Sequence, residues 1–260
     1  MRLVSWNVAG RRSRLAEQAA RVLELDPDIV CLQEVTAPTA APWAERLAAA
    51  GLEAAVAPLP VARDGSRPLA VLTASRPAVK LLPVADVPWP ERVLSVQAGP
   101  LEIVNVHSPI SPKPGLAKVL THEAVFRHLS AGSGPRVVLG DLNTPRKELP
   151  DGSVWTFARS RNGRLRKERG ERWDEAESAL VRGLEKHGFR DAFRALNGFE
   201  SKEPSWEWPS GGGYRLDHLI ASAEVDVTAC SYRHDWRRED KLSDHSALVA
   251  ELDVSAPTPR

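Results

Sequence analysis

The chain has 260 residues, of which 42% are hydrophobic, and this is enough to bury a full core in a single domain. Lysine and arginine total 35 against 34 acidic residues, so a net charge of +1 gives no global attraction to polyanions, and affinity for nucleic acid has to come from local patches. No apolar run reaches signal-peptide or transmembrane length, and we expect a cytoplasmic protein that does not bind membranes. Cys31 and Cys230 lack metal-ligand spacing and are expected in the core.

The N-terminal half mixes short apolar segments with two helix-like stretches. Apolar residues recur at helix spacing between Arg14 and Leu25, and Pro27 ends that helix before the next apolar segment. A second helix is expected at Ala41 to Ala50, with Gly51 as its C-terminal cap. Strands, some joined by short polar links typical of hairpins, are expected at Leu3 to Val8, Ile29 to Val35, Ala54 to Ala57, Leu69 to Ala74, Val79 to Val84, Val93 to Ala98 and Leu101 to His107.

The C-terminal half continues this mixture. A helix is expected at Leu116 to Leu129, and another begins near Trp173, where Asp174 and Glu177 resemble a capping box. Further strands are expected at Arg136 to Leu142, Leu216 to Ser222, Val225 to Tyr232 and Ala247 to Val254. This order predicts an α/β fold, a four-layered sandwich of two mixed, mainly antiparallel β-sheets flanked by helices. We expect one domain over residues 1–254 and a short flexible tail at 255–260.

Polar residues close several of the apolar strands. Asn7 ends the first strand and Glu34 the second, and hydrolytic sites are usually built from such groups at strand ends. A carboxylate helped by an amide and several waters suits Mg²⁺. A single glutamate at a strand end is more often solvated than ligating. The whole set, rather than any one member, indicates metal-assisted phosphoester cleavage.

The segment Gly140-Asp141-Leu142-Asn143 places two polar residues two positions apart. In a strand both side chains point to the same side, so they can converge on one phosphate. Asp141 is then the natural base for an attacking water, while Asn143 donates to a phosphoryl oxygen or holds that base. An Asx turn before Thr144 and Pro145 explains the same residues equally well. Both interpretations stay open on the sequence alone.

The segment Ser243-Asp244-His245 adds a second acid and an imidazole. A histidine can hydrogen-bond a phosphate when another carboxylate fixes its tautomer. Asp217 is the candidate for that carboxylate, because an unpaired aspartate inside a strand would be costly to bury. His107, which ends Val104-Asn105-Val106-His107, is a further candidate for contacting the phosphate or the leaving group. His218 faces the opposite side of its strand and is expected to be structural.

Six short motifs resemble those of the endonuclease/exonuclease/phosphatase superfamily, in its order and about its spacing. They are Ser-Trp-Asn-Val, Leu-Gln-Glu-Val, Asn-Val-His-Ser, Gly-Asp-Leu-Asn, Tyr-Arg-Leu-Asp-His and Ser-Asp-His-Ser. The resemblance covers nearly the whole chain and implies a two-sheet sandwich with outer helices and metal-dependent phosphoester hydrolysis. It implies these roles: Glu34 as a metal ligand helped by Asn7 and Asp244, Asp141 as the base or water-positioning group, Asn143 and His245 as phosphate ligands, and Asp217 as the group that orients His245.

Two further segments, Gly188 to Arg194 and Ser205 to Trp208, resemble the exonuclease III branch, which acts on DNA and abasic sites. Two positions differ from that branch. His107 stands where the branch carries tyrosine, and a histidine at this position resembles the deoxyribonuclease I and sphingomyelinase relatives. Val35 stands where the repair enzymes commonly carry lysine.

Local charge bears on the substrate. Basic residues, among them Arg164, Arg166 and Lys167, are dense between residues 159 and 172, and such a patch can track a phosphate backbone. The alternative is a solvated loop partly neutralised by acidic neighbours. Trp208 is the best candidate for stacking on bases, because Pro209 and the following glycines place it in a loop. Packing at the edge of the core is the alternative for each loop tryptophan.

We therefore expect a divalent-metal-dependent phosphodiesterase, using Mg²⁺ or Mn²⁺, that hydrolyses DNA as an endonuclease or exonuclease, with a role in DNA repair at abasic sites. We expect a monomer. The alternatives are a hydrolase for RNA, a small nucleotide or a lipid head group, and a catalytically silent binding module. The basic segment and the tryptophans favour DNA, and the lack of a membrane-binding helix disfavours a lipid.

Overall fold

The computed structural model describes residues 1–59, 67–76, 78–110 and 115–254, so the expected tail at 255–260 lies outside the described residues. Its helices are α1 (Leu15–Glu24), α2 (Ala37–Ala49), α3 (Ala117–Ala131), α4 (Gly170–Val181), α5 (Ala192–Asn197) and α6 (His234–Arg238), with 3₁₀ turns η1 (Pro90–Arg92) and η2 (Gly183–His187). The strands are β1 (Arg2–Asn7), β2 (Ile29–Val35), β3 (Glu53–Val56), β4 (Ala70–Ser75), β5 (Val79–Leu82), β6 (Val93–Ala98), β7 (Leu101–His107), β8 (Arg136–Asp141), β9 (Lys147–Glu148), β10 (Val154–Trp155), β11 (Phe189–Asp191), β12 (Trp206–Glu207), β13 (Gly213–Tyr214), β14 (Asp217–Ser222), β15 (Val225–Arg233) and β16 (Ala247–Val254).

Most strands form two six-stranded sheets. The first has the order β15-β16-β1-β2-β4-β3 and the second the order β11-β14-β8-β7-β6-β5. Each sheet contains one parallel pair, β1 with β2 and β7 with β8, and its other pairs are antiparallel. The sheets are therefore mixed and mainly antiparallel, as expected from the sequence.

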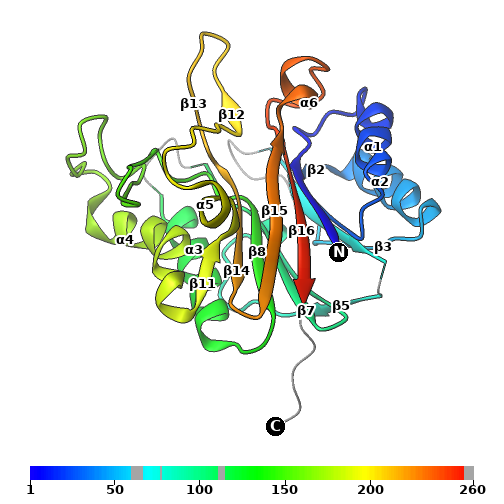
Figure 1. The fold of residues 1–260 in the computed structure, drawn as a ribbon, viewed down its shortest axis with the longest axis horizontal. Helices are drawn as coiled ribbons and strands as arrows, with labels where there is room; N and C mark the ends of the chain where they lie inside the picture. The colour runs from blue at the N-terminus through cyan, green and yellow to red at the C-terminus, as the bar shows by residue number, and fades with distance from the viewer. Residues whose placement is uncertain (60–66, 77, 111–114, 255–260) are drawn as a thin grey trace.

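Helices cover the outer face of each sheet (Figure 1). Helices α1 and α2 lie outside the first sheet, and α3 and α4 lie outside the second. One apolar cluster lies between the sheets, and one further cluster lies between each sheet and its helices. The predicted four-layered sandwich is confirmed.

Side-chain alternation explains why the central strands read as nearly continuous apolar runs. In β1, Leu3 packs between the sheets whereas Val4 packs under the helices. In β8, Leu139 packs between the sheets and Val138 toward α3 and α4. Strands buried on both faces need apolar side chains on both faces, so polar residues occur mainly where the strands end. The carboxyl ends of the two parallel pairs lie at the same edge of the sandwich.

The structure moves some boundaries of the expected helices. Helix α2 begins at Ala37, four residues before the expected start, because Thr36 and Thr39 form its capping box and the early prolines fall in its first turns. Helix α4 begins at Gly170, so Asp174 and Glu177 lie inside it and are not the capping box expected from their spacing. Their carboxylates bond to groups outside the helix instead.

Candidate active site

The predicted polar residues meet at one edge of the sandwich. Asn7 ends β1, His107 ends β7 and Asp141 ends β8, while Asp217 begins β14 directly opposite Asp141. The segment before β16 carries His245 to the same place, because Ser243 Oγ donates to the main-chain oxygen of Asn7 at 2.6 Å and the Trp6 indole donates to the His245 carbonyl at 2.9 Å.

A buried amide contact joins the two sheets behind this edge. Gln33 Nε2 donates to Asn105 Oδ1 at 2.8 Å, and Asn105 donates to the main-chain oxygen of Leu72 at 2.9 Å. Gly140 makes the close approach possible. At its φ of +116°, a Cβ atom would lie 2.2 Å from the Val106 carbonyl oxygen and 3.1 Å from Gln33 Nε2.

Asp141 is the centre of the hydrogen-bond network. Its Oδ1 accepts the main-chain N–H of Asn143 at 3.0 Å, and its Oδ2 accepts Asn7 Nδ2 at 3.0 Å. Burial raises the pKa of this carboxyl, and the negative charge of Asp217 raises it further, against the lowering effect of His245. The result is a fixed carboxylate with an increased affinity for a proton.

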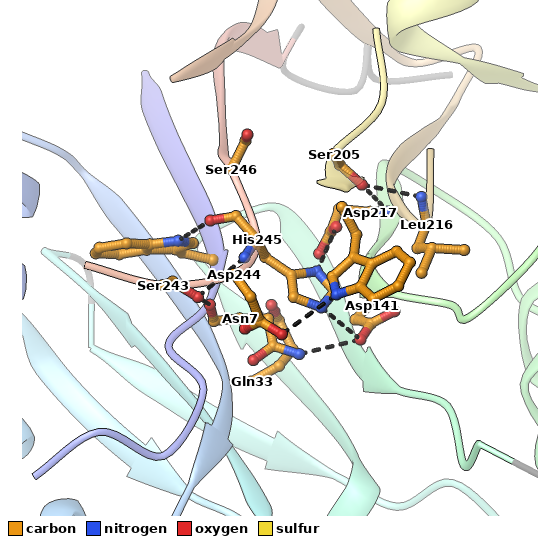
Figure 2. Close-up of polar contacts among 12 residues, drawn as sticks. Asn7, Gln33, Asp141, Ser205, Leu216, Asp217, Ser243, Asp244, His245 and Ser246 are labelled. Atoms are coloured by element: carbon orange, nitrogen blue, oxygen red, sulfur yellow. Dashed lines mark hydrogen bonds and ion pairs between the residues drawn. The ribbon is translucent and has the colours of Figure 1, made fainter. Parts of the chain in front are cut away.

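His245 lies between two carboxylates (Figure 2). Its Nδ1 lies 2.8 Å from Asp217 Oδ2, and its Nε2 lies 3.8 Å from Asp141 Oδ2. Asp217 therefore fixes the tautomer with a proton on Nδ1 and directs Nε2 toward Asp141. Burial by itself would lower the pKa of His245, but the charges of Asp217 and Asp141 outweigh burial and raise it.

His107 lies on the opposite side of Asp141. Its Nε2 is 3.8 Å from Asp141 Oδ2 and also 3.8 Å from Glu34 Oε1. Arg92 Nη1 contacts its Nδ1 at 2.6 Å. Burial, followed by the positive charge of Arg92, holds the pKa of His107 well below its usual range, so this imidazole is neutral at neutral pH.

Asn143 forms the Asx turn that is one of the two interpretations of the Gly140-Asp141-Leu142-Asn143 segment. The bond from its N–H to Asp141 Oδ1 is that of an Asx turn, and its φ of +50° is left-handed. The side-chain Nδ2 donates to the carbonyl of Ser108 at 2.7 Å. Asn143 thus orients Asp141 through its main chain, and one of its two amide N–H groups is engaged away from the site.

The donor set fits a hard divalent cation. Glu34 Oε1 lies 3.4 Å from Asn7 Nδ2 and Glu34 Oε2 lies 3.5 Å from Arg67 Nη1, which are long contacts that leave lone pairs for a metal. Asp217 Oδ1 is buried with no hydrogen-bond partner among the described residues, and Asp244 is exposed at the same edge. Oxygen donors of this kind are what Mg²⁺ and Mn²⁺ prefer. Asn7 Oδ1 accepts the N–H of Ala9, which uses one of its two lone pairs, and its Nδ2 points to the carboxylates.

A second set of three groups also lies within metal-binding distance. Ligand atoms of Asp141, Asp217 and His245 all lie within 4.8 Å of one another. His245 Nδ1 is already hydrogen-bonded to Asp217 Oδ2, and we therefore describe this set as a proton-binding array.

The expected substrate-binding residues lie outside this network. Trp208 is on the β12–β13 hairpin and is 37% exposed, and Arg164 and Lys167 are exposed on the segment before α4. Arg166 lines a pocket that also contains Asn143, and it pairs with Glu168 at 2.7 Å, as the alternative of partial neutralisation predicts.

Three neighbouring residues were missed from the sequence. Lys118 on α3 donates to the main-chain oxygen of Asn143 at 2.6 Å, and Glu177 on α4 pairs with Lys118 at 2.9 Å. Arg92 contacts His107. All three side chains are charged and buried. A charged residue on an otherwise apolar helix face was the available signal for Lys118 and Glu177, but its partner cannot be read from the sequence.

The fold and the site define a phosphoester hydrolase of the two-sheet type. Comparison with protein families gives the same answer, because the model of the endonuclease/exonuclease/phosphatase family matches residues 4–245. The chain belongs to this family, whose members depend on a divalent metal ion. In the described part of the chain, no helix is long and apolar enough to cross a membrane.

Relatives in this family include DNA-processing enzymes. The chain is 26% identical to a DNA-(apurinic or apyrimidinic site) endonuclease of Dictyostelium discoideum, over 98% of this chain and 71% of that protein. It is also 26% identical to exodeoxyribonuclease III of Haemophilus influenzae, over 97% of this chain and all of that protein (100%). Among solved structures, an AP endonuclease from Archaeoglobus fulgidus has a TM-score of 0.74 at 21% identity and covers 98% of this chain and 100% of its own.

Proposed function

We propose that this protein hydrolyses phosphodiester bonds in DNA, with Mg²⁺ or Mn²⁺ as its cofactor. The observation that carries the proposal is the buried array of Asp217, His245 and Asp141, in which one carboxylate fixes an imidazole that faces a second carboxylate 3.8 Å away. At this separation Nε2 and the carboxylate do not hydrogen-bond each other, but the oxygen of a phosphate or of an attacking water that lies beside them can contact both.

Each side chain then has a defined task. Asp141, held by Asn7 and the Asn143 N–H, positions the attacking water and takes its proton as the new phosphorus–oxygen bond forms. The raised pKa of His245 keeps both ring nitrogens protonated, so His245 donates from Nε2 to a non-bridging oxygen, and the second amide N–H of Asn143 is available for another. His107 contacts the leaving oxygen, which takes its proton from solvent as its bond to phosphorus breaks.

The acidic residues on the other side of Asn7 complete the site. Glu34 and Asp244 would hold the divalent ion, which when bound supplies positive charge against the charge that develops on the phosphoryl oxygens. Asn7 acts in this proposal mainly through Nδ2, as the link between Glu34 and Asp141.

Several observations support DNA as the substrate. The named relatives act on DNA or on its abasic sites, and a basic and aromatic surface adjoins Asn143. We propose that the protein acts as a monomer, because one chain supplies the whole array, and that it is cytoplasmic. Preference for abasic sites is a separate proposal, because His107 and Val35 differ from the residues of the repair enzymes. The abasic duplex in the experiment below tests it.

The test is a panel of labelled substrates with purified protein. Intact duplex, abasic duplex, single-stranded DNA, RNA and bis-p-nitrophenyl phosphate are each incubated with Mg²⁺, Mn²⁺ or EDTA. The expected result is cleavage of DNA that EDTA abolishes and added metal restores. Cleavage of RNA or of the small ester in preference to DNA would overturn the DNA assignment, and DNA cleavage that persists in EDTA would overturn the metal dependence.

A further inference from the structure

We infer that Ser205 is a positioning residue for the reaction, which holds Asp217 and His245 at the separation at which they hydrogen-bond each other. The inference rests on the proposed function, because it concerns the imidazole that is proposed to hold the phosphate. It is carried by hydrogen bonds from Ser205 to the segments of both partners. Ser205 lies between α5 and β12 and has no exposed surface.

The pair of Asp217 and His245 needs a fixed separation that lies outside either sheet. Asp217 begins β14 in the second sheet, whereas His245 lies directly before β16 of the first sheet. The ladder hydrogen bonds fix distances within each sheet. The bond between His245 Nδ1 and Asp217 Oδ2 at 2.8 Å therefore crosses from one sheet to the other. A displacement of roughly 1 Å would break a hydrogen bond of this length.

Ser205 contacts both sides of this gap (Figure 2). Its Oγ accepts the main-chain N–H of Leu216 at 2.9 Å and that of Asp217 at 3.1 Å. Its carbonyl oxygen accepts the N–H of Ser246, the residue that follows His245, at 2.8 Å. One buried residue thus ties the start of β14 to the segment that carries the imidazole.

The segment that leads into this serine is anchored to α6. The imidazole of His234 lies between two partners, with Nδ1 at 2.8 Å from Ser246 Oγ and Nε2 in contact with the carboxylate of Glu203. Arg237 Nη2 donates to the carbonyl of Pro204 at 3.2 Å. These contacts hold the main chain on both sides of the bond between the serine carbonyl and the Ser246 N–H.

Two other contacts act on the same pair. The phenol of Tyr232 on β15 donates to the main-chain oxygen of Asp217 at 2.6 Å. Trp206 forms an antiparallel bridge with His245. Each of these contacts reaches one member of the pair, whereas Ser205 reaches the segments of both. Ser205 is therefore the residue whose loss should change their separation most.

Loss of the Ser205 hydroxyl would leave two buried main-chain N–H groups without their acceptor. The start of β14 would then be free to shift, and Asp217 would shift with it. The imidazole of His245 would lose the orientation that directs Nε2 toward the phosphate. Because the charge on the phosphoryl oxygens increases in the transition state, a misdirected donor should lower kcat more than it changes KM.

The kinetic test compares two serines of the same kind. Ser222, at the other end of β14, is also buried, and its Oγ also accepts a main-chain N–H, that of Arg136, at 3.0 Å. Ser205→Ala should lower kcat by about tenfold or more with KM within about twofold of the wild type, while Ser222→Ala should keep kcat. Ser205→Thr, which retains the hydroxyl, should recover most of the loss. Equal kcat values in the two alanine variants would overturn the inference.

A spectroscopic test in EDTA does not depend on catalysis. The proton between His245 Nδ1 and Asp217 gives a far-downfield ¹H NMR signal, which His245→Gln assigns by removing it. The signal should be unchanged in Ser222→Ala and should move upfield or disappear in Ser205→Ala, with circular dichroism as the folding check. An unchanged signal in folded Ser205→Ala would contradict the role of Ser205.

If Ser205→Ala does not fold, Ser205→Cys takes its place in both tests, because sulfur is a weaker acceptor in nearly the same position. The outcomes also separate the inference from the proposed function. If the wild type cuts DNA and the Ser205 variants match Ser222→Ala, the inference fails and the proposed function stands. If the wild type cuts no DNA, the proposed function fails, and the NMR signal still decides whether Ser205 holds the pair.

Discussion

The ammonium group of Lys118 donates to the main-chain oxygen of Asn143 at 2.6 Å from a side chain that is only 3% exposed. Glu177, which is fully buried, neutralises it at 2.9 Å and accepts a further bond from Thr144 Oγ1 at 2.7 Å. One buried ion pair between α3 and α4 therefore holds the left-handed turn at Asn143, and this turn orients Asp141.

Lys118→Met should lower both stability and turnover. Removing one member of a buried pair leaves the charge of Glu177 uncompensated, which costs about 3–5 kcal/mol in the free energy of unfolding. The freed Asn143 turn should also reduce kcat more than it changes KM. Urea unfolding and steady-state kinetics measure the two effects. Recovery of stability in Lys118→Met/Glu177→Gln is expected, and a single variant as stable as the wild type would contradict the role of the pair.

Asp141→Asn should remove most activity without unfolding the chain. The amide has the size of the carboxylate and can still accept the N–H of Asn143, but it cannot take a proton from water, so kcat should fall by about 10²–10⁴. Rates on the preferred DNA substrate, with circular dichroism as the folding check, test this. Asp226→Asn, at an exposed position on β15, is the matched control. Near-wild-type turnover in Asp141→Asn would show that another group is the base.

Stability should decrease in acid because of Glu148. Burial by itself would raise the pKa of this carboxyl, but Arg215 and Arg194, at 2.5 and 2.6 Å, outweigh burial and lower the pKa to about 2. A folded-state pKa below the unfolded value of about 4.5 stabilises the fold above pH 4.5, and this contribution is lost as the pH falls toward 2.

At neutral pH this contribution is about 3 kcal/mol, because the folded and unfolded pKa values of Glu148, about 2 and 4.5, differ by about 2.5 and each pKa unit corresponds to 1.36 kcal/mol. Urea unfolding between pH 7 and pH 2.5 measures it. Glu148→Gln should be less stable than the wild type at pH 7 and should lose less stability on acidification. An identical pH dependence in the variant would assign the acid sensitivity to other groups.

Gly140→Ala should destabilise the protein strongly. A Cβ atom at this φ of +116° would collide with the Val106 carbonyl, and β7 and β8 would have to separate. Gly134→Ala is the matched control, because it has a φ of +82° and open space around the added atom. It should cost only the backbone strain of about 1–2 kcal/mol. Thermal unfolding of both variants makes the comparison, and equal losses would mean that close packing at Gly140 is unimportant.

The strand-end residues of the site could be predicted because a polar side chain that closes an apolar strand is visible in the sequence. Asn7, Asp141 and His107 were found in this way, and the two-sheet fold followed from the strand pattern. Asn143 was ambiguous, since the Asx turn and the catalytic interpretation use the same residue types, and the structure shows the turn acting on Asp141.

The supporting residues could not be predicted, because their partners lie far away in the sequence. The spacing of Asp174 and Glu177 imitated a helix start, but Asp174 bonds Arg159 and Glu177 reaches Lys118 on another helix. Trp155 is one of the tryptophans that lie in loop-like segments of the sequence. Its fixed position depends on Gly163, whose close packing no periodicity reveals.

The buried contact between Gln33 and Asn105 has a consequence for how the protein loses activity. Asn7, Glu34 and His245 belong to one sheet or its connections, and His107, Asp141 and Asp217 belong to the other. The catalytic centre thus lies at the interface between the two sheets, and the hydrogen bonds between strands hold each sheet together separately. A slight slip of one sheet over the other would separate Asp141 from Asn7 while leaving every strand and helix intact. Inactivation by heat or denaturant should accordingly precede the loss of secondary structure.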